Sequence, residues 1–540
     1  MDCTAQRIPY RQTSYFANIV LDYLDQVEKL KPFFANPPSL QGIKKAIEAR
    51  KQYNTDRALL VDELKKQYAK SATSDSVSKN IESLLSVDTF TICTAHQPNI
   101  LTGPLFFIYK ILHVIKLAEH LSKSLQGFKF VPVFYMGSED ADLDELGHIN
   151  LNSEKLVWST KQTGAVGRMK IDAAFVKLLS VVEGQLDVLP FGKEILRLVK
   201  DSYKEGVDIQ SATFQFVNAL LGEFGLIIFL PDNAAFKKKM IPIFKDDLLN
   251  QTPSGIVEKT SQKLGETYKI QANPREINLF YLKDNIRERI IYINSKFKIT
   301  NQATNGEGNS KLSFSQEEMM EELQNHPDRF SPNVILRGLY QETILPNLVF
   351  VGGGGELSYW LQLKDLFSHY NTPFPVLLLR NSFLVVEKKL QEKISKLGFT
   401  IEDFFLPEQD LVNMVIARES KNETKLNGTL SETEQLYEQI KKQAAAVDFT
   451  LTDHVEALRA MTIRRLHELE KKMLRAEKRK FGDHQRQIHA IKEKLFPAGS
   501  LQERYDNVLA YYARWGKNFI SKVYEHSLKL EQEFVILTET

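Results

Sequence analysis

Residues 89–145 read TFTICTAHQPNILTGPLFFIYKILHVIKLAEHLSKSLQGFKFVPVFYMGSEDADLDE, and this stretch decides the fold. Residues 89–94 form a β-branched run of the kind found in strands. A largely apolar helix is expected over residues 104–121, because proline suits the first helical turn. A second strand is expected over residues 128–136, and it runs into an acidic loop, 138–145. Strand, helix and strand in this order predict a βαβ unit and hence a parallel sheet.

Apolar runs without alternation recur further along the chain, and such runs are typical of strands buried in a parallel sheet. They cover residues 226–230, 334–336, 348–351 and 375–379. Residues 277–300 alternate instead, which predicts antiparallel ribbons. The chain therefore has the pattern of an α/β protein with insertions in its sheet.

Helical spacing dominates the two ends of the chain. Residues 458–476 carry apolar side chains close to every 3.5 residues, flanked by charges, which is typical of a coiled-coil seam. We expect this helix to form an antiparallel hairpin with the helix that carries Ile488, Ile491 and Leu495. The expected segments are an N-terminal helical segment (1–85), the first part of the core (86–150), insertions with further core elements (151–330), the last part of the core (331–383) and a helical coiled-coil domain (384–540).

The composition excludes several classes of protein. The chain has 540 residues, 43% hydrophobic and 26% charged, so a large core is possible and wholesale disorder is excluded. Lys and Arg number 70 against 68 Asp and Glu, so no global field favours nucleic acid or membrane. Two cysteines, Cys3 and Cys93, exclude a disulfide scaffold and a zinc site of four thiolates. With no export signal and no apolar run of spanning length, a reducing cytoplasm is the expected setting.

The first candidate site is the loop between the first strand and its helix. The start of a helix presents free N–H groups that attract anions, and His96 and Gln97 add donors there. Gly103 permits close backbone approach. The alternative is a buried histidine in a tight turn. Lys110, two turns into the helix, could reach a phosphate or a carboxylate, or could extend to solvent.

The second candidate site is the acidic loop, which has five carboxylates within residues 139–145. Open α/β sheets bind ligands at the ends of their strands, where this loop lies. Its carboxylates could hold Mg²⁺, bind an amine substrate or act as a general base. The alternative is a solvated loop that caps the next helix.

The third candidate site combines Arg337 with residues 352–355, which are four consecutive glycines. An arginine that follows a β-run can clamp a carboxylate or a phosphate. Four glycines cost much backbone entropy, which favours either positive φ angles or a ligand against the backbone before a helix at Glu356. The alternative is a flexible lid.

A basic stretch, residues 478–480, lies on the expected coil, where a solvated face and RNA contact are the two readings. The chain has no GxSxG and no HExxH motif, and neither cysteine has a recognisable nucleophile setting. Covalent and zinc chemistry are therefore not expected.

At these candidate residues the chain resembles the family of the bacillithiol biosynthesis cysteine-adding enzyme, a cysteine ligase. Four blocks carry the resemblance in order along nearly the whole chain. They are His96-Gln97 with Gly103-Pro104-Leu105 and Tyr109-Lys110; Glu139-Asp140 with Asp144-Glu145; Ser331-Pro332-Asn333 with Arg337, Tyr340-Gln341 and Gly352 to Trp360; and Phe496-Pro497 with Leu501-Gln502-Glu503-Arg504.

The resemblance implies a Rossmann-like parallel-sheet core, similar to class I aminoacyl-tRNA synthetases, with insertions and a C-terminal coiled coil that makes a homodimer. It implies a reaction that joins the carboxyl group of cysteine to the amine of glucosaminyl-malate to give bacillithiol. Because a carboxylate and an amine do not condense in water, ATP is expected as the activating agent, through a cysteinyl-adenylate, with Mg²⁺ as a further cofactor. Small-molecule substrates are expected as partners, without membrane or nucleic acid.

The resemblance also assigns expected roles. The expected catalytic residues are His96, Gln97, Asp140, Asp142 and Arg337. The expected nucleotide- or substrate-binding residues are Asn99, Gly103, Lys110, Glu139, Asn333, Gln341, Gly353, Gly354, Glu356 and Tyr359. Ala141 stands where the family often has histidine, and His96 replaces a frequent glutamine. Two other classes of function remain open, a non-catalytic nucleotide- or RNA-binding protein and a metal-dependent hydrolase.

Overall fold

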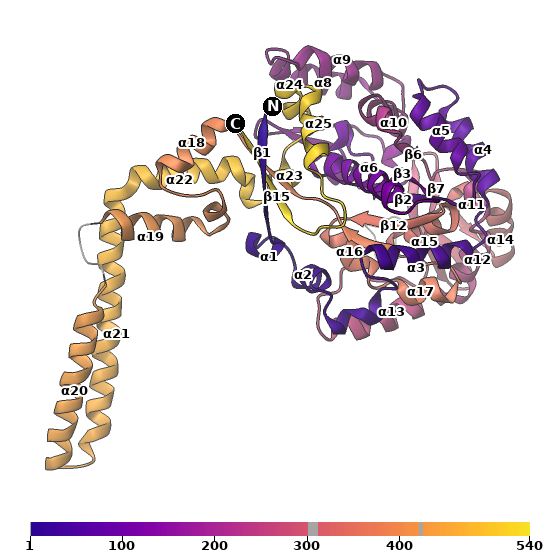
Figure 1. Cartoon of the computed structure of the whole chain (residues 1–540). Coiled ribbons are helices and arrows are strands. Elements are labelled where there is room, and N and C mark those ends of the chain that lie inside the picture. The colour runs from indigo at the N-terminus through magenta and orange to yellow at the C-terminus, as the bar shows by residue number, and fades with distance from the viewer. Residues whose placement is uncertain (1, 301–311, 421–424) are drawn as a thin grey trace. The chain divides into compact units, whose positions relative to one another are not determined.

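The computed structural model describes residues 2–300, 312–420 and 425–540 (Figure 1). The chain divides into two compact units. The first unit contains Met1–Val385 and Leu501–Thr540, and the second contains Val386–Ser500. The chain therefore leaves the first unit once and returns to it. Among the described helices, none combines the length and the apolar character needed to cross a membrane.

A five-stranded parallel sheet forms the centre of the first unit, in the order β13-β12-β2-β3-β6. Its strands are β2 (Thr89–His96), β3 (Lys129–Met136), β6 (Ile227–Phe229), β12 (Asn347–Gly352) and β13 (Val376–Leu379). β2 was predicted from its β-branched residues and the other four from their apolar residues, and the βαβ unit of residues 89–136 is confirmed. The α/β class with a parallel-sheet core is confirmed with it.

The core of this unit lies between the sheet and two helices. The apolar helix α6 (Phe106–Ser124) packs on β2 and β3, and α3 (Leu40–Lys51) packs on β12 and β13. Val114 and Leu117 of α6, and Ile43 of α3, join strand residues in one buried cluster. Burial of such side chains stabilises the fold by about 1.5–3 kcal/mol each, so this layer fixes the strand ends that carry the candidate loops.

Two smaller sheets extend the first unit. Five antiparallel strands follow the order β10-β9-β8-β7-β11: β7 (Leu279–Lys283), β8 (Ile286–Ile293), β9 (Lys296–Thr300), β10 (Leu312–Phe314) and β11 (Phe330–Pro332). The alternation of residues 277–300 predicted the first three of these strands. A further sheet has the order β1-β15-β14, with β1 (Cys3–Ile8), β14 (Phe383–Val386) and β15 (Phe534–Glu539). A separate two-stranded hairpin pairs β4 (His148–Leu151) with β5 (Glu154–Val157).

Helices surround these sheets (Figure 1). The N-terminal helices are α1 (Tyr10–Thr13), α2 (Asn18–Leu24), α4 (Arg57–Tyr68) and α5 (Asp75–Ser83). The middle helices are α7 (Leu143–Leu146), α8 (Ala173–Leu186), α9 (Gly192–Ser202), α10 (Ile209–Leu221), α11 (Ala234–Lys238), α12 (Ile241–Asn250), α13 (Thr252–Gly265) and α14 (Gln316–Asn325). The later helices are α15 (Val334–Ile344), α16 (Gly354–Trp360), α17 (Lys364–His369), α23 (Gln502–Tyr505), α24 (Val508–Trp515) and α25 (Lys517–His526).

One predicted strand is wrong. Residues 334–336 form the first turn of α15 rather than a strand, because Asn333 caps that helix. The Asn333 side-chain oxygen accepts a hydrogen bond from the Ile335 backbone N–H at 2.9 Å. Arg337 therefore projects from a helix and not from the end of a strand.

The second unit is helical. Its helices are α18 (Lys388–Lys396), α19 (Glu408–Glu419), α20 (Asn427–Val447), α21 (Leu451–Lys478) and α22 (Gly482–Leu495). The long helix α21 pairs with α20 as an antiparallel hairpin, and Lys441 and Glu456 form a 2.6 Å ion pair between them (Figure 1). The coiled-coil helix was predicted, but its predicted partner is wrong. Ile488, Ile491 and Leu495 lie on α22, which packs on α19.

The helical domain was expected to run from residue 384 to the last residue, whereas the compact second unit ends at Ser500. β15 pairs with β1 from Cys3 to Ile8 inside the first unit. The side chain of Gln502 fixes the point of return, because it accepts from the Val385 N–H at 2.9 Å and donates to the Val385 carbonyl at 3.1 Å.

Candidate active site

A cleft of about 1180 Å³ opens in the first unit where β2, β3 and β12 end. It is lined by residues of all three candidate segments, which the sheet brings together from distant parts of the chain. Ten of the fifteen expected site residues line it: His96, Gln97, Asp140, Asp142, Asn333, Arg337, Gly353, Gly354, Glu356 and Tyr359.

Asp140 is the point at which the three segments meet most closely. One of its carboxylate oxygens accepts from the Gln97 amide at 3.3 Å and from the Arg337 guanidinium at 3.3 Å. Its other oxygen lies 3.5 Å from the Arg287 guanidinium. Burial alone would raise the pKa of Asp140, but Arg337 and Arg287 outweigh burial and lower that pKa to about 2. The carboxylate is therefore ionised at any physiological pH.

His96, the last residue of β2, lines the cleft with a neutral ring. Burial lowers its pKa well below the usual value, and the nearby charges of Lys110 and Arg380 lower it further. Its ring contacts the rings of Phe106 and Phe107, with centroids 5.2 and 5.6 Å away. The His96 Nε2 atom is buried without a hydrogen-bond partner among the described residues. It is therefore free to form a hydrogen bond with a bound ligand.

Lys110 lies beneath the cleft rather than on its surface. Its ammonium group is buried and donates to the Glu356 carboxylate at 2.7 Å and to the Ala95 carbonyl at 2.5 Å. The Glu356 carboxylate also accepts from the Gly353 N–H at 2.8 Å. Burial lowers the pKa of Lys110, and the pair with Glu356 opposes that change. Lys110 therefore binds a carboxylate of the protein, that of Glu356, rather than one of a ligand. The same carboxylate holds the glycine segment through the Gly353 N–H.

The glycine segment, residues 352–355, has no positive φ angle, so that part of the expectation is wrong. Close packing explains one position, because a Cβ on Gly352 would lie 2.8 Å from the Phe350 ring. At Gly355 a Cβ would meet only Gln271 Nε2, at 3.9 Å. The absence of side chains there leaves room in the cleft for a ligand.

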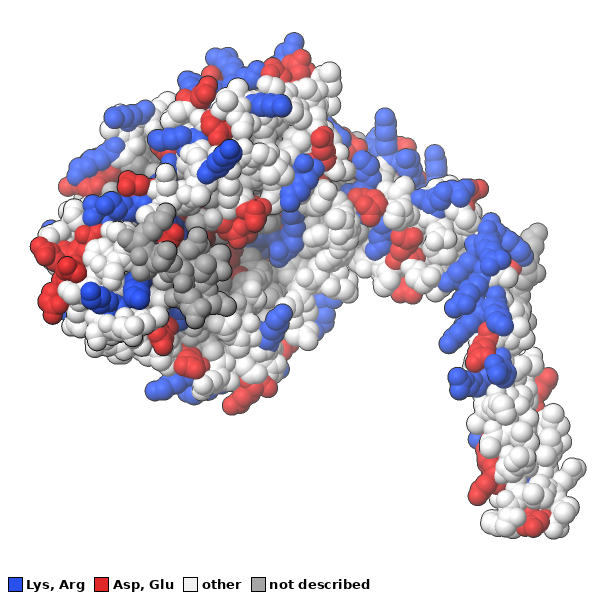
Figure 2. Space-filling model, turned by 180° about the vertical axis from the view of Figure 1, so that it is seen from behind, with Lys and Arg blue, Asp and Glu red and all other residues white. Residues whose placement is uncertain are grey.

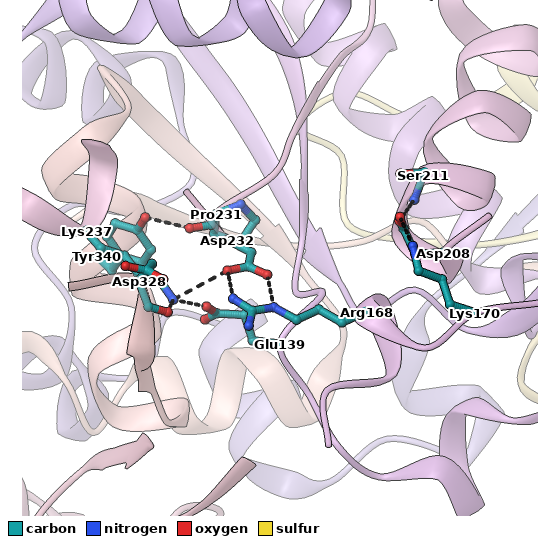
Figure 3. Close-up of polar contacts among 10 residues, drawn as sticks. All are labelled: Glu139, Arg168, Lys170, Asp208, Ser211, Pro231, Asp232, Lys237, Asp328 and Tyr340. Atoms are coloured by element: carbon teal, nitrogen blue, oxygen red, sulfur yellow. Dashed lines mark hydrogen bonds and ion pairs between the residues drawn. The ribbon is translucent and has the colours of Figure 1, made fainter. Parts of the chain in front are cut away.

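Five expected site residues do not line the cleft. Asn99 donates to the Glu145 carbonyl at 3.4 Å, and Gly103 adopts a φ of +60° in the turn before α6. Gln341 is buried and donates to Glu342 at 2.9 Å. Lys110 has been described above, and Glu139 is buried in an ion pair with Lys237 (Figure 3). These placements assign all five to the support of the cleft rather than to its surface.

The acidic loop sends its carboxylates in different directions. Asp142 accepts from the Glu145 N–H at 3.0 Å and so caps α7, as the alternative reading of this loop expected. Asp140 turns to the two arginines and Glu139 to the interior. Within the described ranges, no three His, Cys, Asp or Glu side chains gather as a metal site would need.

Sequence reasoning missed four arginines that line the cleft: Arg275, Arg287, Arg380 and Arg504. Arg380 forms a buried ion pair with Glu503 at 2.7 Å and lies 4.9 Å from the centre of the Phe106 ring. Arg504 belongs to the C-terminal block that carries the resemblance, and this was the available signal for it. Nothing local marks Arg275, in the loop before β7, or Arg287, on β8, because each becomes part of the cleft only through the folded arrangement of the chain.

The second unit carries a basic patch at the end of α21 and in the following 3-10 turn η7 (Arg479–Phe481) (Figure 2). Five of its cations have no ion-pair partner within the described part of the chain: Lys471, Lys472, Arg475, Lys478 and Arg479. Lys480 pairs with Glu477 at 2.8 Å. Most of these side chains are exposed, as on a solvated helix face.

Comparison with known proteins covers nearly the whole chain. Residues 1–381 match the model of the bacillithiol biosynthesis BshC N-terminal Rossmann-like domain, and residues 383–539 match that of the BshC C-terminal coiled-coil domain. The boundary between these two domain models, at residues 381–383, lies next to the expected boundary between the core and the coiled-coil domain, at residue 383.

Curated relatives carry the name "Putative cysteine ligase BshC". The protein of Flavobacterium johnsoniae is 37% identical, over 98% of this chain and 99% of its own length. That of Cytophaga hutchinsonii is 36% identical, over 97% and 96%, and that of Chlorobaculum tepidum 26% identical, over 87% and 86%.

Among solved structures, a chain titled as a "putative arginyl t-RNA synthetase" from Campylobacter jejuni is 11% identical and covers 91% of this chain and 100% of its own. Its TM-score of 0.20 carries no argument about the fold. The two domain models and the full-length relatives agree with the four sequence blocks, all of which contribute residues to the cleft. The chain belongs to the bacillithiol biosynthesis BshC family.

Proposed function

We propose that the protein is a cysteine ligase of bacillithiol biosynthesis, which joins the carboxyl group of cysteine to the amine of glucosaminyl-malate. The names of the full-length relatives support the ligase activity. The observation that carries the proposal is the ionised Asp140 carboxylate between Arg337 and Arg287 in one large cleft. Such a site offers one group to an ammonium ion and several to anions, as an amine and a carboxylate substrate require.

Asp140 binds the substrate ammonium group in this proposal. A carboxylate with a pKa of about 2 is a weak base, so it attracts and orients an amine better than it removes a proton. Arg337 and Arg287 then have a second task beyond Asp140, because the malate carboxylates need cations nearby. The neutral His96 ring offers one N–H to the carboxyl oxygen as charge develops there.

ATP, when bound, supplies a leaving group for the cysteine carboxyl, which would otherwise not react with an amine. Two observations support the binding of ATP in the cleft. Its volume exceeds that of a usual small-ligand pocket, about 300–1,000 Å³, and Gly355 leaves its floor open. Arg380 and Arg504 would hold the phosphates, and the glycine segment would face the adenine or the ribose. Mg²⁺, if required, would arrive with the phosphates, since the acidic loop does not gather its carboxylates.

The test is incubation of the purified protein with cysteine, glucosaminyl-malate and ATP, followed by mass spectrometry for bacillithiol and for AMP or ADP. Serine in place of cysteine is the substrate control. Product that depends on ATP, with matching release of AMP or ADP, supports the proposal. Product release without ATP on addition of Mg²⁺ or Mn²⁺ would favour a metal-dependent hydrolase instead.

We also propose a homodimer through the helical hairpin of the second unit. The hairpin exposes several apolar side chains, among them Leu436, Met461 and Leu469. Exposed apolar rows on paired helices are usually covered by a partner. Light scattering coupled to size exclusion would give twice the chain mass of 62.0 kDa.

A further inference from the structure

A buried ion-pair network includes Glu139, the residue before Asp140 (Figure 3). Its centre is Lys237 of α11, which is fully buried and paired with Glu139, the residue before Asp140. The Lys237 ammonium also lies 3.7 Å from Asp232 and donates to the Asp328 carbonyl at 2.9 Å. Lys237 therefore joins three loops at one point.

A second cation closes the network. Arg168, at the end of the 3-10 turn η3 (Val166–Arg168), donates two hydrogen bonds of 2.7 Å to the Asp232 carboxylate. Two carboxylates, those of Glu139 and Asp232, thus meet two cations (Figure 3). This balance matters because a buried charge without a partner is strongly unfavourable.

The same turn holds the backbone on both sides of Glu139. The Val166 N–H donates to the Asp140 carbonyl at 2.7 Å, and the Gly167 N–H donates to the Ser138 carbonyl at 3.0 Å. These bonds and the Glu139–Lys237 pair form a closed ring through η3, Asp232 and the acidic loop. These contacts hold the backbone of residues 138–140 and so determine the direction of the Asp140 side chain.

The helix of Arg337 is tied to the network as well. Tyr340 of α15, one turn after Arg337, donates to the Pro231 carbonyl at 2.8 Å, and Pro231 adjoins Asp232 (Figure 3). Both partners of the Asp140–Arg337 pair are therefore fixed to one internal framework, although neither belongs to it.

We infer that Lys237 is a positioning residue: by neutralising Glu139 in the interior, it holds residues 138–140 so that Asp140 faces Arg337 and Arg287. Without Lys237, the Glu139 carboxylate cannot remain buried and turns towards the cleft, where it competes with Asp140 for the arginines. The effect of this change on catalysis rests on the proposed function, whereas its effect on the loop does not.

The charge balance predicts that removing Lys237 and removing the charge of Glu139 have different effects on the loop. Lys237→Met leaves an unpaired buried carboxylate and releases the loop. Glu139→Gln leaves Lys237 with Asp232 and the Asp328 carbonyl, so the loop stays in place. The double variant Lys237→Met/Glu139→Gln removes both charges and restores the balance. Lys238→Met, a change of the same kind at the exposed neighbouring position on α11, is the matched control.

Hydrogen–deuterium exchange of the full-length protein measures the loop without any substrate. In Lys237→Met we expect faster exchange of the Val166 and Gly167 amides, and wild-type exchange in α6. Glu139→Gln, the double variant and Lys238→Met should retain protection at Val166 and Gly167. Unchanged protection in a folded Lys237→Met protein overturns the inference.

Ligase kinetics supply the second readout. Lys237→Met should lower kcat about 100-fold, the usual result of a reacting group displaced by about 1 Å, and the double variant should recover most of that loss. No recovery in the double variant would mean that Lys237 acts otherwise than through Glu139. If Lys237→Met does not fold, the double variant decides: its failure to fold as well overturns the inference. If the wild type makes no bacillithiol, the proposed function fails, and the exchange experiment still decides the role of Lys237.

Discussion

The Asp140 carboxylate lies 3.3 Å from the Arg337 guanidinium, although the two residues are 197 positions apart in the sequence. The parallel sheet makes this contact, because Asp140 follows β3 and Arg337 lies on the helix before β12. The pair is largely shielded from water, with about one fifth of each side chain exposed. This ion pair should therefore affect both the activity and the stability of the protein, and the two effects can be measured separately.

Asp140→Asn should lower the rate of bacillithiol formation about 100-fold, because the amide cannot attract the substrate ammonium group. Asp62→Asn is the control, since Asp62 is exposed on α4 and does not line the cleft. Steady-state kinetics of the two variants provide the comparison. Equal rates in Asp140→Asn and wild type would remove Asp140 from the reaction.

The same pair predicts how stability depends on pH. Arg337 and Arg287 lower the pKa of Asp140 to about 2 in the folded protein, against about 3.9 in an unfolded chain. Its ionised form therefore favours the folded state by about 2–3 kcal/mol above pH 4 or so, and this contribution disappears as the pH falls towards 2. Urea unfolding of wild type and Asp140→Asn should give a stability difference that is constant from neutral pH to about pH 5 and narrows below about pH 4. A difference that did not narrow would contradict the role of the arginines.

Gly167→Ala should displace the acidic loop. A Cβ at this position would lie 2.3 Å from the Ser138 carbonyl oxygen, so backbone must move. We expect a loss of about 1–3 kcal/mol of stability, together with lower activity. Gly184→Ala is the control, because nothing lies within 4 Å of its added Cβ and alanine favours a helix. Thermal unfolding should therefore move in opposite directions for the two variants.

Lys110→Met should destabilise the first unit far more than Lys123→Met, although both residues belong to α6. Lys110 is buried against Glu356, and breaking such a pair costs about 3–5 kcal/mol. Lys123 pairs with Glu119 at the surface, where a pair contributes about 0–1 kcal/mol. Unfolding midpoints of the two variants test this contrast, and similar midpoints would count against it.

His96→Gln should retain activity within about tenfold of wild type, whereas His96→Ala should lose about 100-fold. Burial lowers the pKa of His96, so its ring acts as a neutral hydrogen-bonding group, which glutamine can replace. The acid side of the pH–rate profile should be the same in wild type and His96→Gln. A limb near pH 6.5 that vanished in the variant would show that His96 titrates during turnover.

The sequence predicted the central sheet because its signals are local. Of the five strands in this sheet, β2 is a β-branched run, the other four contain apolar runs, and the helix between β2 and β3 is apolar over most of its length. The run at residues 334–336 was misread because a short apolar segment fits a strand and a helix equally well. The cap at Asn333, which decides the matter, depends on one side-chain hydrogen bond.

The remaining features depend on contacts between distant segments. β1 is mostly exposed along its length and has no apolar run, so only its pairing with β15 reveals a strand. The cleft arginines also could not be predicted from local sequence. Arg287, for example, becomes part of the site only when β8 is placed opposite the end of β3. Sequence predicted which loops carry the polar groups, but not that Glu139 would turn inward while Asp140 turns to the cleft.

The return of the chain at Gln502 has a consequence for biosynthesis. The ribosome delivers β1 more than five hundred residues before β15, and Arg504 of the cleft emerges only after the helical hairpin has been made. A nascent chain that stalls within the hairpin therefore carries an unfinished pocket and an unpaired edge strand. Synthesis of residues 501–540 therefore supplies both Arg504 of the pocket and the β15 strand that pairs with β1.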